Sequence, residues 1–176
     1  YDVEPGTNPG FLYQQNTMRD AMVAAINLNI FNNHADRVVM ANLAQMVNVL
    51  QAVILTDGDQ MLLTPTYHVF DLYKAHQDAT LLPTEVECPV AGGINSVTAS
   101  ASVKDGIITV TAANIDCDNA QQITLDIANC DVKKVTARIL AGEMHDKNTF
   151  EDKECVKIAD FTDFTVTEEG VVLNLP

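Results

Sequence analysis

Apolar and polar positions near the start of the chain follow the period of a helix. From residue 17 to residue 33, apolar side chains recur every three or four positions, at Met18, Ala21, Met22, Ala25, Ile26 and Ile30. This spacing predicts a helix over 17–33. Thr17 is a suitable N-cap, Asp20 places a carboxylate near the free amides of the first turn, and "NNH" provides a stop. Only Arg19 and Asp20 are charged along it, so we expect much of its circumference to be buried.

The next segment has the pattern of a buried strand followed by a second helix. Residues 37–47, "RVVMANLAQMV", are apolar and begin with β-branched residues, which predicts a strand covered on both faces, as in parallel sheets. Residues 49–56, "VLQAVILT", fit a strand or a helix. A helix is predicted from Thr64, with Pro65 in its first turn, through "TYHVFDLYKAH". Loop, helix, buried strand and helix in this order are typical of an α/β repeat.

After Pro83 the pattern changes to short alternating runs. "SVTASASV" and "GIITVTAAN" flank "KDG", which predicts a hairpin, and four further runs follow as "QQITLDIA", "KVTARIL", "FTVT" and "VVLNL". This pattern predicts an antiparallel β-sandwich. The chain is therefore expected to be α+β overall, with one part over 1–83 and a second part over 84–176.

Composition excludes some partners and leaves others open. With 176 residues, 47% of them hydrophobic, the chain can bury a core. A formal net charge of -14, with few and scattered Lys and Arg residues, argues against nucleic acid and anionic membranes as partners. No apolar stretch reaches the roughly 20 residues that span a bilayer, and no basic-then-apolar leader opens the chain, so no membrane anchor is expected. The compartment, cytoplasm or periplasm, stays open.

No complete catalytic set and no metal or cofactor site is predicted. His68 and His76 are eight positions apart on one helix, too far to share a metal without a third partner. The acidic pairs Glu85 with Glu87 and Glu168 with Glu169 are interpreted as solvated loop acids. Hydrolysis of a sugar needs two carboxylates about 5 to 9 Å apart, normally from separate elements.

The cysteines lack the spacing of a zinc site. They lie far apart in the second half of the chain, at Cys88, Cys117, Cys130 and Cys155. We expect most of them to be reduced and partly buried, while two disulfides remain the alternative.

Residues 42–51, "NLAQMVNVLQ", carry a carboxamide at every third position in an otherwise apolar run. The four amides are Asn42, Gln45, Asn48 and Gln51. A buried amide without a partner costs on the order of 1 to 3 kcal/mol. Each of the four is therefore expected either to have an internal partner or to face a cleft.

Three stretches together resemble glycoside hydrolase family 51, the α-L-arabinofuranosidases. They are "YDVEPGTNPGFLYQQNTMRDAMVAAINLNIFNNHADRVVMANLAQMVNVLQAVILT", "LLTPTYHVFDLYKAHQDATLLP" and "ARILAGEMHDKNTFEDKECV". A single motif such as "NTFED" is weak, but the order and spacing of all three are specific. The resemblance covers nearly the whole chain.

The resemblance implies the C-terminal portion of such an enzyme. Residues 1–83 would supply the last helix, strand and helix of a (β/α)8 TIM barrel, and residues 84–176 a jelly-roll-like β-sandwich. The family mechanism is retaining, with one glutamate as acid/base and another as nucleophile. The first lies in an Asn-Glu dipeptide and the second in an Asp-Glu-Trp motif, and the chain contains neither. We expect no catalytic residue here, and an isolated chain that is inactive.

The resemblance also assigns a role to one of the four amides. Gln45 matches a family glutamine at the end of the eighth barrel strand that hydrogen-bonds arabinose, so Gln45 is the predicted substrate-binding residue, with a packing amide as the alternative. A carboxamide can donate to one hydroxyl and accept from another. On a continuous strand Asn42 and Asn48 would face the other way and are expected to be satisfied structural amides, while Gln51 has no predicted role.

The function implied for the parent protein is that of an exo-acting α-L-arabinofuranosidase. Its expected substrates are terminal non-reducing α-L-arabinofuranosyl residues of plant-wall arabinan, arabinoxylan or their oligosaccharides. A non-catalytic carbohydrate-binding or assembly module is the alternative. Sugar binding by the second part is disfavoured, since its only aromatic residues are Phe150, Phe161 and Phe164. Apolar faces of residues 18–55 favour assembly, so we expect homo-oligomers or pairing with a further chain segment.

Overall fold

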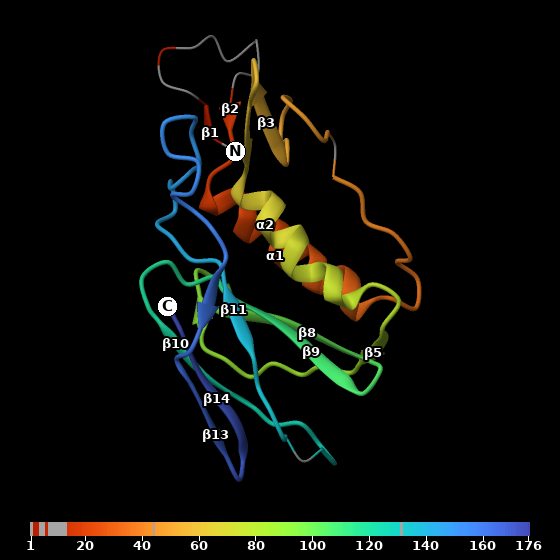
Figure 1. Ribbon diagram of the computed structural model, residues 1–176. Helices are drawn as coiled ribbons and strands as arrows, with labels where there is room; N and C mark the ends of the chain where they lie inside the picture. The colour runs from red at the N-terminus through yellow and green to blue at the C-terminus, as the bar shows by residue number, and fades with distance from the viewer. Residues whose placement is uncertain (1, 4–5, 7–13, 44, 131) are drawn as a thin grey trace.

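The computed structural model describes residues 2–3, 6, 14–43, 45–130 and 132–176. Most of the polar stretch before the first helix lies outside the described residues. Within that stretch, β1 (Asp2–Val3) and β2 (Gln14–Gln15) pair antiparallel. Two helices, α1 and α2, lie side by side on one face of a sheet, and a second sheet lies beyond it (Figure 1).

Helix α1 (Met18–Asn33) confirms the predicted helix. The Thr17 backbone N–H donates to the Asp20 carboxylate at 2.8 Å, which is half of the expected capping box. Its buried face carries mainly Met18, Ala21, Ala25 and Asn29. The expectation that much of its circumference is buried is confirmed, since only Val23, Asn27, Ile30 and Phe31 of its residues are exposed. No described element covers the outer face that carries these four residues.

Helix α2 (Pro65–Tyr73) also lies where it was predicted. The Thr64 hydroxyl accepts a hydrogen bond from the Tyr67 backbone N–H at 3.4 Å, and Pro65 occupies the first turn, where its missing N–H costs nothing. A short 3₁₀ helix, η2 (Lys74–His76), continues from its end. Both helices therefore begin at the signals visible in the sequence.

The buried strand predicted over 37–47 is not observed. Among the described residues of this segment, Val47 alone makes a β-bridge, to Ile54. Val39 and Met40 are 91% and 73% exposed. A parallel strand needs neighbouring strands for its hydrogen bonds and cover for both faces, and among the described residues β3 reaches this segment only at its end, through the bridge to Val47. The helix–strand–helix order of a barrel is therefore not seen in the described part of the chain.

Strand β3 (Ile54–Asp57) resolves the ambiguous "VLQAVILT" in part as a strand. It pairs antiparallel with β4 (Gln60–Leu63), which the sequence analysis did not predict. Gly58 in the connecting turn has φ +58°, a conformation that glycine adopts without a steric cost.

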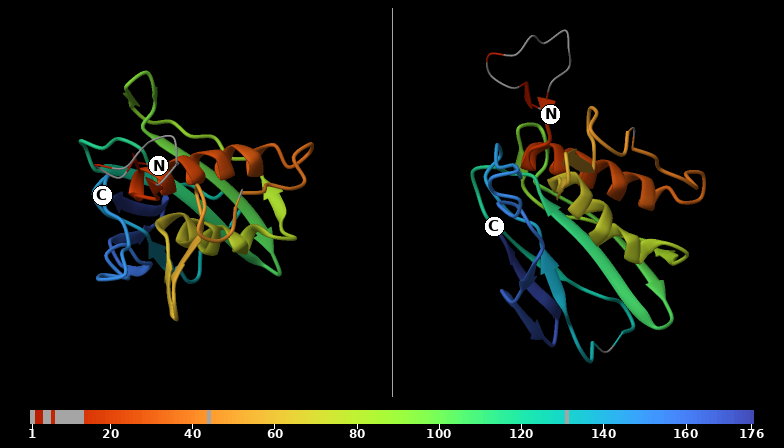
Figure 2. Two further views of the ribbon diagram at one scale, coloured as in Figure 1. Left: turned by 90° about the horizontal axis from the view of Figure 1, so that it is seen from above. Right: turned by 45° about the horizontal axis from the view of Figure 1, so that its top comes forward.

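The second part of the chain consists of antiparallel strands, as predicted. One sheet has the order β5-β8-β9, and its predicted hairpin turns at Asp105 and Gly106. A second has the order β10-β14-β13, and β11 with β12 and β6 with β7 form two smaller pairs. The bounds are β5 (Thr80–Leu82), β6 (Val90–Ala91), β7 (Ile94–Asn95), β8 (Val97–Lys104), β9 (Ile107–Asn114), β10 (Gln121–Leu125), β11 (Ala137–Ile139), β12 (Ala159–Phe161), β13 (Phe164–Thr167) and β14 (Gly170–Leu175). Figure 2 shows the two larger sheets facing each other.

One hydrophobic core joins the helices to the sheets. It contains Met18 and Ala25 of α1, Val69 of α2, Ala113 of β9 and Val156. Strand β5, at residues 80–82, pairs with β8 and so belongs to the sheet. Packing is thus continuous across residue 83, and a domain boundary at that residue stays a prediction.

The connection between β11 and β12, residues 140–158, reaches the N-termini of both helices. The Met18 and Arg19 backbone N–H groups donate to the carbonyls of Asp146 and Met144 at 2.8 and 3.0 Å. The buried Asn148 side chain donates to the Leu63 carbonyl at 2.8 Å, immediately before α2. The two contacts to Met18 and Arg19 satisfy N–H groups that a helix start otherwise leaves free.

Candidate functional site

Gln45, the predicted substrate-binding residue, is exposed on the irregular segment between α1 and β3. It directly precedes a closed loop. The Ile54 backbone N–H donates to the Met46 carbonyl at 3.1 Å, and the Asn48 N–H donates to the Ile54 carbonyl at 3.2 Å. The residue after Gln45 is therefore already hydrogen-bonded to the start of β3.

Asn48 fastens one side of this loop with its side chain. Its Nδ2 donates to the Thr56 hydroxyl at 2.8 Å, and its Oδ1 accepts from the Thr56 backbone N–H at 2.7 Å. Its φ of +56° lies in the left-handed region, which asparagine tolerates better than most residues. The prediction of a satisfied structural amide is confirmed for Asn48. It was wrong for Asn42, whose side chain is exposed and open to water.

Gln51 fastens the other side of the loop. Its Nε2 donates to Oδ1 of Asp20 at 3.1 Å, and Asp20, only 4% exposed, lies in the first turn of α1. The next carbonyl, of Ala52, accepts from the Asn16 side chain at 2.9 Å and from the Thr64 hydroxyl at 3.0 Å. Sequence analysis gave Gln51 no role, because its partner lies 31 positions earlier and no local spacing reveals the pair.

A groove of about 470 Å³ runs along the outer face of α1 beside this loop. Its wall is mostly apolar and includes Val23, Leu28, Phe31 and Leu43, with amides such as Gln51 at one end. Gln45 does not line the groove. Of the four amides, Asn42 and Gln51 line the groove and Asn48 does not.

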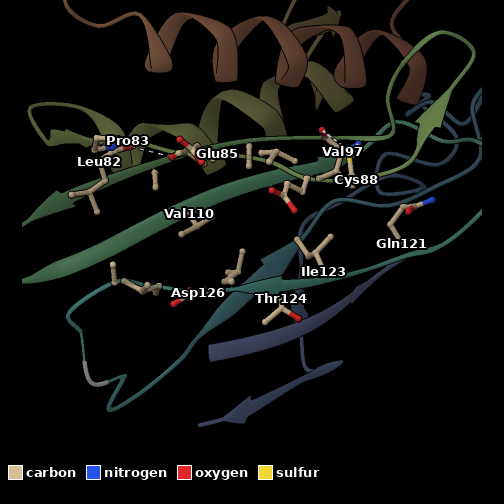
Figure 3. Close-up of a pocket in the computed structure, with 18 of the residues that line it drawn as sticks. Leu82, Pro83, Glu85, Cys88, Val97, Val110, Gln121, Ile123, Thr124 and Asp126 are labelled. Carbon is tan, nitrogen blue, oxygen red and sulfur yellow. Dashed lines mark hydrogen bonds between the residues drawn. The ribbon is translucent and has the colours of Figure 1, made fainter. Parts of the chain in front are cut away.

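A larger cavity of about 570 Å³ lies between the two sheets of the sandwich. Figure 3 shows Val110 of β9 and Ile123 of β10 on opposite sides of it. None of its described lining residues is aromatic, so it offers no stacking surface for a sugar ring. Glu85 and Glu87 are part of its wall and are exposed. Their interpretation as solvated loop acids is confirmed.

Glu168 and Glu169 are likewise exposed, in the turn between β13 and β14, so the same interpretation is confirmed for this second acidic pair. Asp126, directly after β10, lines the same cavity as Glu85 and Glu87, on the side opposite Glu85 in Figure 3.

The two helical histidines have structural surroundings. His76 lies with Nδ1 2.7 Å from the Ser102 hydroxyl and Nε2 3.1 Å from the Thr111 hydroxyl, and burial lowers its pKa. Burial also lowers the pKa of His68, against the opposing charges of Asp71 and Glu154. Over the described residues, no three His, Cys, Asp or Glu side chains gather as a metal site would require.

All four cysteines are free thiols. Only Cys88 is half-buried, so the expectation of partial burial was wrong for Cys117, Cys130 and Cys155, which are exposed. The described helices include none that is long and apolar enough to cross a membrane.

Comparisons with known proteins cover the full length of the chain. The family model described as "Alpha-L-arabinofuranosidase C-terminal domain" matches residues 1–176. The chain is 45% identical over 183 aligned residues to the intracellular exo-alpha-L-arabinofuranosidase of Bacteroides ovatus. That alignment covers 100% of this chain and 36% of the relative.

Solved structures give the same picture. The GH51 arabinofuranosidase from Xanthomonas axonopodis pv. citri superposes with a TM-score of 0.92 at 44% identity, over 100% of this chain and 37% of that one. The alpha-L-arabinofuranosidase from Thermotoga maritima in its arabinose complex gives 0.83 at 25% identity, over 100% and 39%. The chain thus spans little more than a third of these relatives. It belongs to the α-L-arabinofuranosidase C-terminal domain family and corresponds to the C-terminal portion of a glycoside hydrolase family 51 enzyme.

Proposed function

We propose that this chain is part of a retaining, exo-acting α-L-arabinofuranosidase. The parent enzyme removes terminal non-reducing α-L-arabinofuranosyl residues from plant-wall arabinan, arabinoxylan or oligosaccharides derived from them. The observation that carries the proposal is the 45% identity to the Bacteroides ovatus exo-alpha-L-arabinofuranosidase along the whole chain. In this proposal, residues 1–83 complete a (β/α)8 barrel and residues 84–176 form the sandwich attached to it.

The catalytic glutamates of the parent lie outside this chain. Residues 1–176 contain no Asn-Glu dipeptide and no Trp, and both acidic pairs are exposed turn or loop residues. A chain that lacks both the proton donor and the nucleophile cannot protonate the leaving group or form a covalent intermediate. The isolated chain is therefore inactive.

Gln45 contributes a contact to the sugar. Its carboxamide is exposed, so a ligand can reach it, and it offers a donor and an acceptor to neighbouring hydroxyls of a neutral furanose. Its backbone leads directly into the loop fastened by Asn48 and Gln51. An amide held on a fastened segment loses less freedom on binding than one on a free loop.

The exposed apolar side chains between α1 and β3 support a larger assembly. Val39, Met40, Met46 and Val47 are all exposed in the chain by itself. Large apolar side chains exposed along one segment favour packing against further polypeptide. In the parent enzyme this face is covered by the rest of the barrel; a second copy of the chain that covers the same face would give the homo-oligomer.

Activity assays on the parent enzyme and on the isolated chain test this function. With para-nitrophenyl α-L-arabinofuranoside, the parent is expected to release nitrophenol and residues 1–176 are not. Gln45→Ala in the parent should raise KM, whereas Gln77→Ala, which removes another exposed carboxamide, should not. A parent without activity contradicts the function, and an unchanged KM for Gln45→Ala contradicts the role of Gln45 alone.

The exposed face also favours the second candidate function, an assembly module. Sedimentation of the isolated chain across concentrations tests it, with Met40→Ser and Met46→Ser as variants on that face. If the chain forms defined oligomers that these variants dissociate, while the parent lacks activity, assembly becomes the function. A monomer at all concentrations contradicts it.

A further inference from the structure

The carboxamides at 48 and 51 have no substrate role in the proposed function, yet both are engaged in side-chain hydrogen bonds. We propose that Asn48 and Gln51 are positioning residues, which hold the loop after Gln45 so that the Gln45 amide is presented to the arabinofuranosyl group. This inference rests on the proposed function. It gives a reason for two of the four amides in the run.

The Asn48 side chain acts as a substitute for a strand neighbour. It accepts from the Thr56 backbone N–H at 2.7 Å and donates to the Thr56 hydroxyl at 2.8 Å, so donor and acceptor are both used. The Asn48 N–H also donates to the Ile54 carbonyl. With the Ile54 N–H bonded to Met46, two residues at the start of the loop are tied to β3. Gln45 is the residue next to this attachment.

Gln51 connects the same loop to helix α1. Its Nε2 donates to the buried Asp20 carboxylate at 3.1 Å. The second oxygen of Asp20 accepts from the Thr17 backbone N–H and hydroxyl at 2.8 and 3.0 Å. The carboxylate is thus fixed at the start of α1, and a hydrogen bond to a charged group is among the stronger ones. The loop is held between β3 on one side and α1 on the other.

The requirement at position 51 is for a donor. A glutamate side chain introduced there would face the Asp20 carboxylate with like charge at hydrogen-bonding distance, which is unfavourable in a buried place. Replacing Asp20 by Asn reverses the polarity of that partner, because its amide can donate to the introduced carboxylate while its oxygen still accepts from Thr17. Combining Gln51→Glu with Asp20→Asn exchanges the amide and the carboxylate between the two positions. Both substitutions nearly preserve side-chain size, so they test the hydrogen bond itself.

The test uses the parent enzyme with Gln51→Glu, Asp20→Asn and the double variant. Gln51→Glu is expected to raise KM for para-nitrophenyl α-L-arabinofuranoside by about tenfold with a smaller effect on kcat, as loss of a ground-state sugar contact predicts. Asp20→Asn should have a small effect, because the Gln51 amide can rotate to accept. The double variant should restore KM to within about threefold of the unchanged enzyme. Gln122→Glu, an exposed amide on β10, is the matched control and should leave KM unchanged.

A second background separates positioning from general stability. In Gln45→Ala, adding Gln51→Glu should raise KM no further, because the amide being positioned is already absent. An equal rise in both backgrounds, or no rescue in the double variant, overturns the inference. If Gln51→Glu fails to fold, Asn48→Gly keeps the left-handed backbone accessible, removes both bonds to Thr56, and must show the same dependence on Gln45. A parent without activity overturns the proposed function, and this inference with it.

Discussion

The hydroxyl oxygen of Tyr73, at the end of α2, lies 2.9 Å from Oδ1 of Asn29 in the middle of α1. The same Oδ1 lies 2.9 Å from the hydroxyls of Ser100 on β8 and Thr111 on β9. Asn29 is fully buried, so a single amide joins both helices to the sheet beneath them. We call these four residues the helix–sheet cluster. Inside a protein such a network stabilises strongly when it is satisfied and is costly to disrupt.

Replacing Asn29 by Ala is expected to destabilise the chain by about 1 kcal/mol, because three hydroxyls lose one of their partners. The Tyr73 hydroxyl keeps the Ala25 carbonyl, and the Ser100 and Thr111 hydroxyls keep each other. The substitution also removes the buried Nδ2 of Asn29, which has no partner among the described residues. Urea unfolding followed by circular dichroism measures this change. Asn27→Ala, on an exposed face of the same helix, is the control, since the Asn27 side chain bonds to the Val23 carbonyl one turn earlier and to no other described residue. Equal losses of stability for the two substitutions would show that the helix–sheet cluster adds no stability beyond that of an ordinary surface amide.

Stability should fall as the pH drops below the ordinary His76 value of 6.5. Burial lowers the pKa of His76 in the folded chain, so the unfolded chain takes up the proton first and is favoured at acidic pH. Its ring nitrogens also face two hydroxyls, of Ser102 and Thr111. The free energy of unfolding, measured between about pH 5 and 7, should depend less on pH in His76→Gln.

His68 has a pKa lowered in the same direction, so His68→Gln should remove a separate part of the same dependence. The free energy of unfolding should then depend least on pH in the double variant, compared with the unchanged chain and the two single variants. A His76→Gln slope identical to that of the unchanged chain would contradict the assignment.

Asn148→Asp should destabilise the chain by about 2 kcal/mol or more, because it replaces a donor with an acceptor. Its Nδ2 donates to two carbonyls, of Leu63 and Val156, at 2.8 and 2.9 Å, and the side chain is 2% exposed. An aspartate would face both carbonyls with an oxygen. Asn95→Asp, exposed on β7, adds the same charge and should change the melting temperature little. Equal melting temperatures for Asn148→Asp and Asn95→Asp would contradict the prediction.

Gly170→Ala tests a close backbone contact between two strands. A Cβ on Gly170 would lie 2.1 Å from the Leu125 carbonyl oxygen, and φ is +135°. Gly106→Ala provides the comparison, because its φ of +77° is also positive but nothing lies within 4 Å of the added atom. We expect Gly106→Ala to lower the free energy of unfolding by about 1 kcal/mol, through backbone strain alone. Gly170→Ala should lower it by at least about 2 kcal/mol, because the steric clash is added. Chemical denaturation of both variants measures the difference.

Both helices could be predicted because their signals are local. Thr17 with Asp20, and Thr64 with Pro65, lie within one turn of the helix starts that they mark. The hairpin around Gly106 has the same local character. The strand expected over 37–47 failed for the opposite reason, since a parallel strand depends on neighbours that its own sequence does not contain.

The candidate site was predictable only in part. Asn48 was expected to be satisfied on a continuous strand, and it is satisfied by Thr56, eight positions away, although that strand is not observed and Asn48 is exposed. The Gln51 contact and the helix–sheet cluster could not be found this way, because Asn29 lies 71 positions from Ser100 and 82 from Thr111. Pairs of polar residues this far apart in sequence leave no period or spacing to detect. Gln45 owes its predicted role to family resemblance, and that role stays a prediction.

The carbonyls of Met144 and Asp146 that cap the first turn of α1 also set an order for folding. A ribosome releases α1 long before those carbonyls exist, so the nascent helix begins with its leading N–H groups bonded to water. Closing this contact joins two segments that lie far apart in the sequence, which is the kind of distant contact that slows folding. We therefore expect the first turn of α1 to become protected from hydrogen exchange only after the sandwich strands have formed.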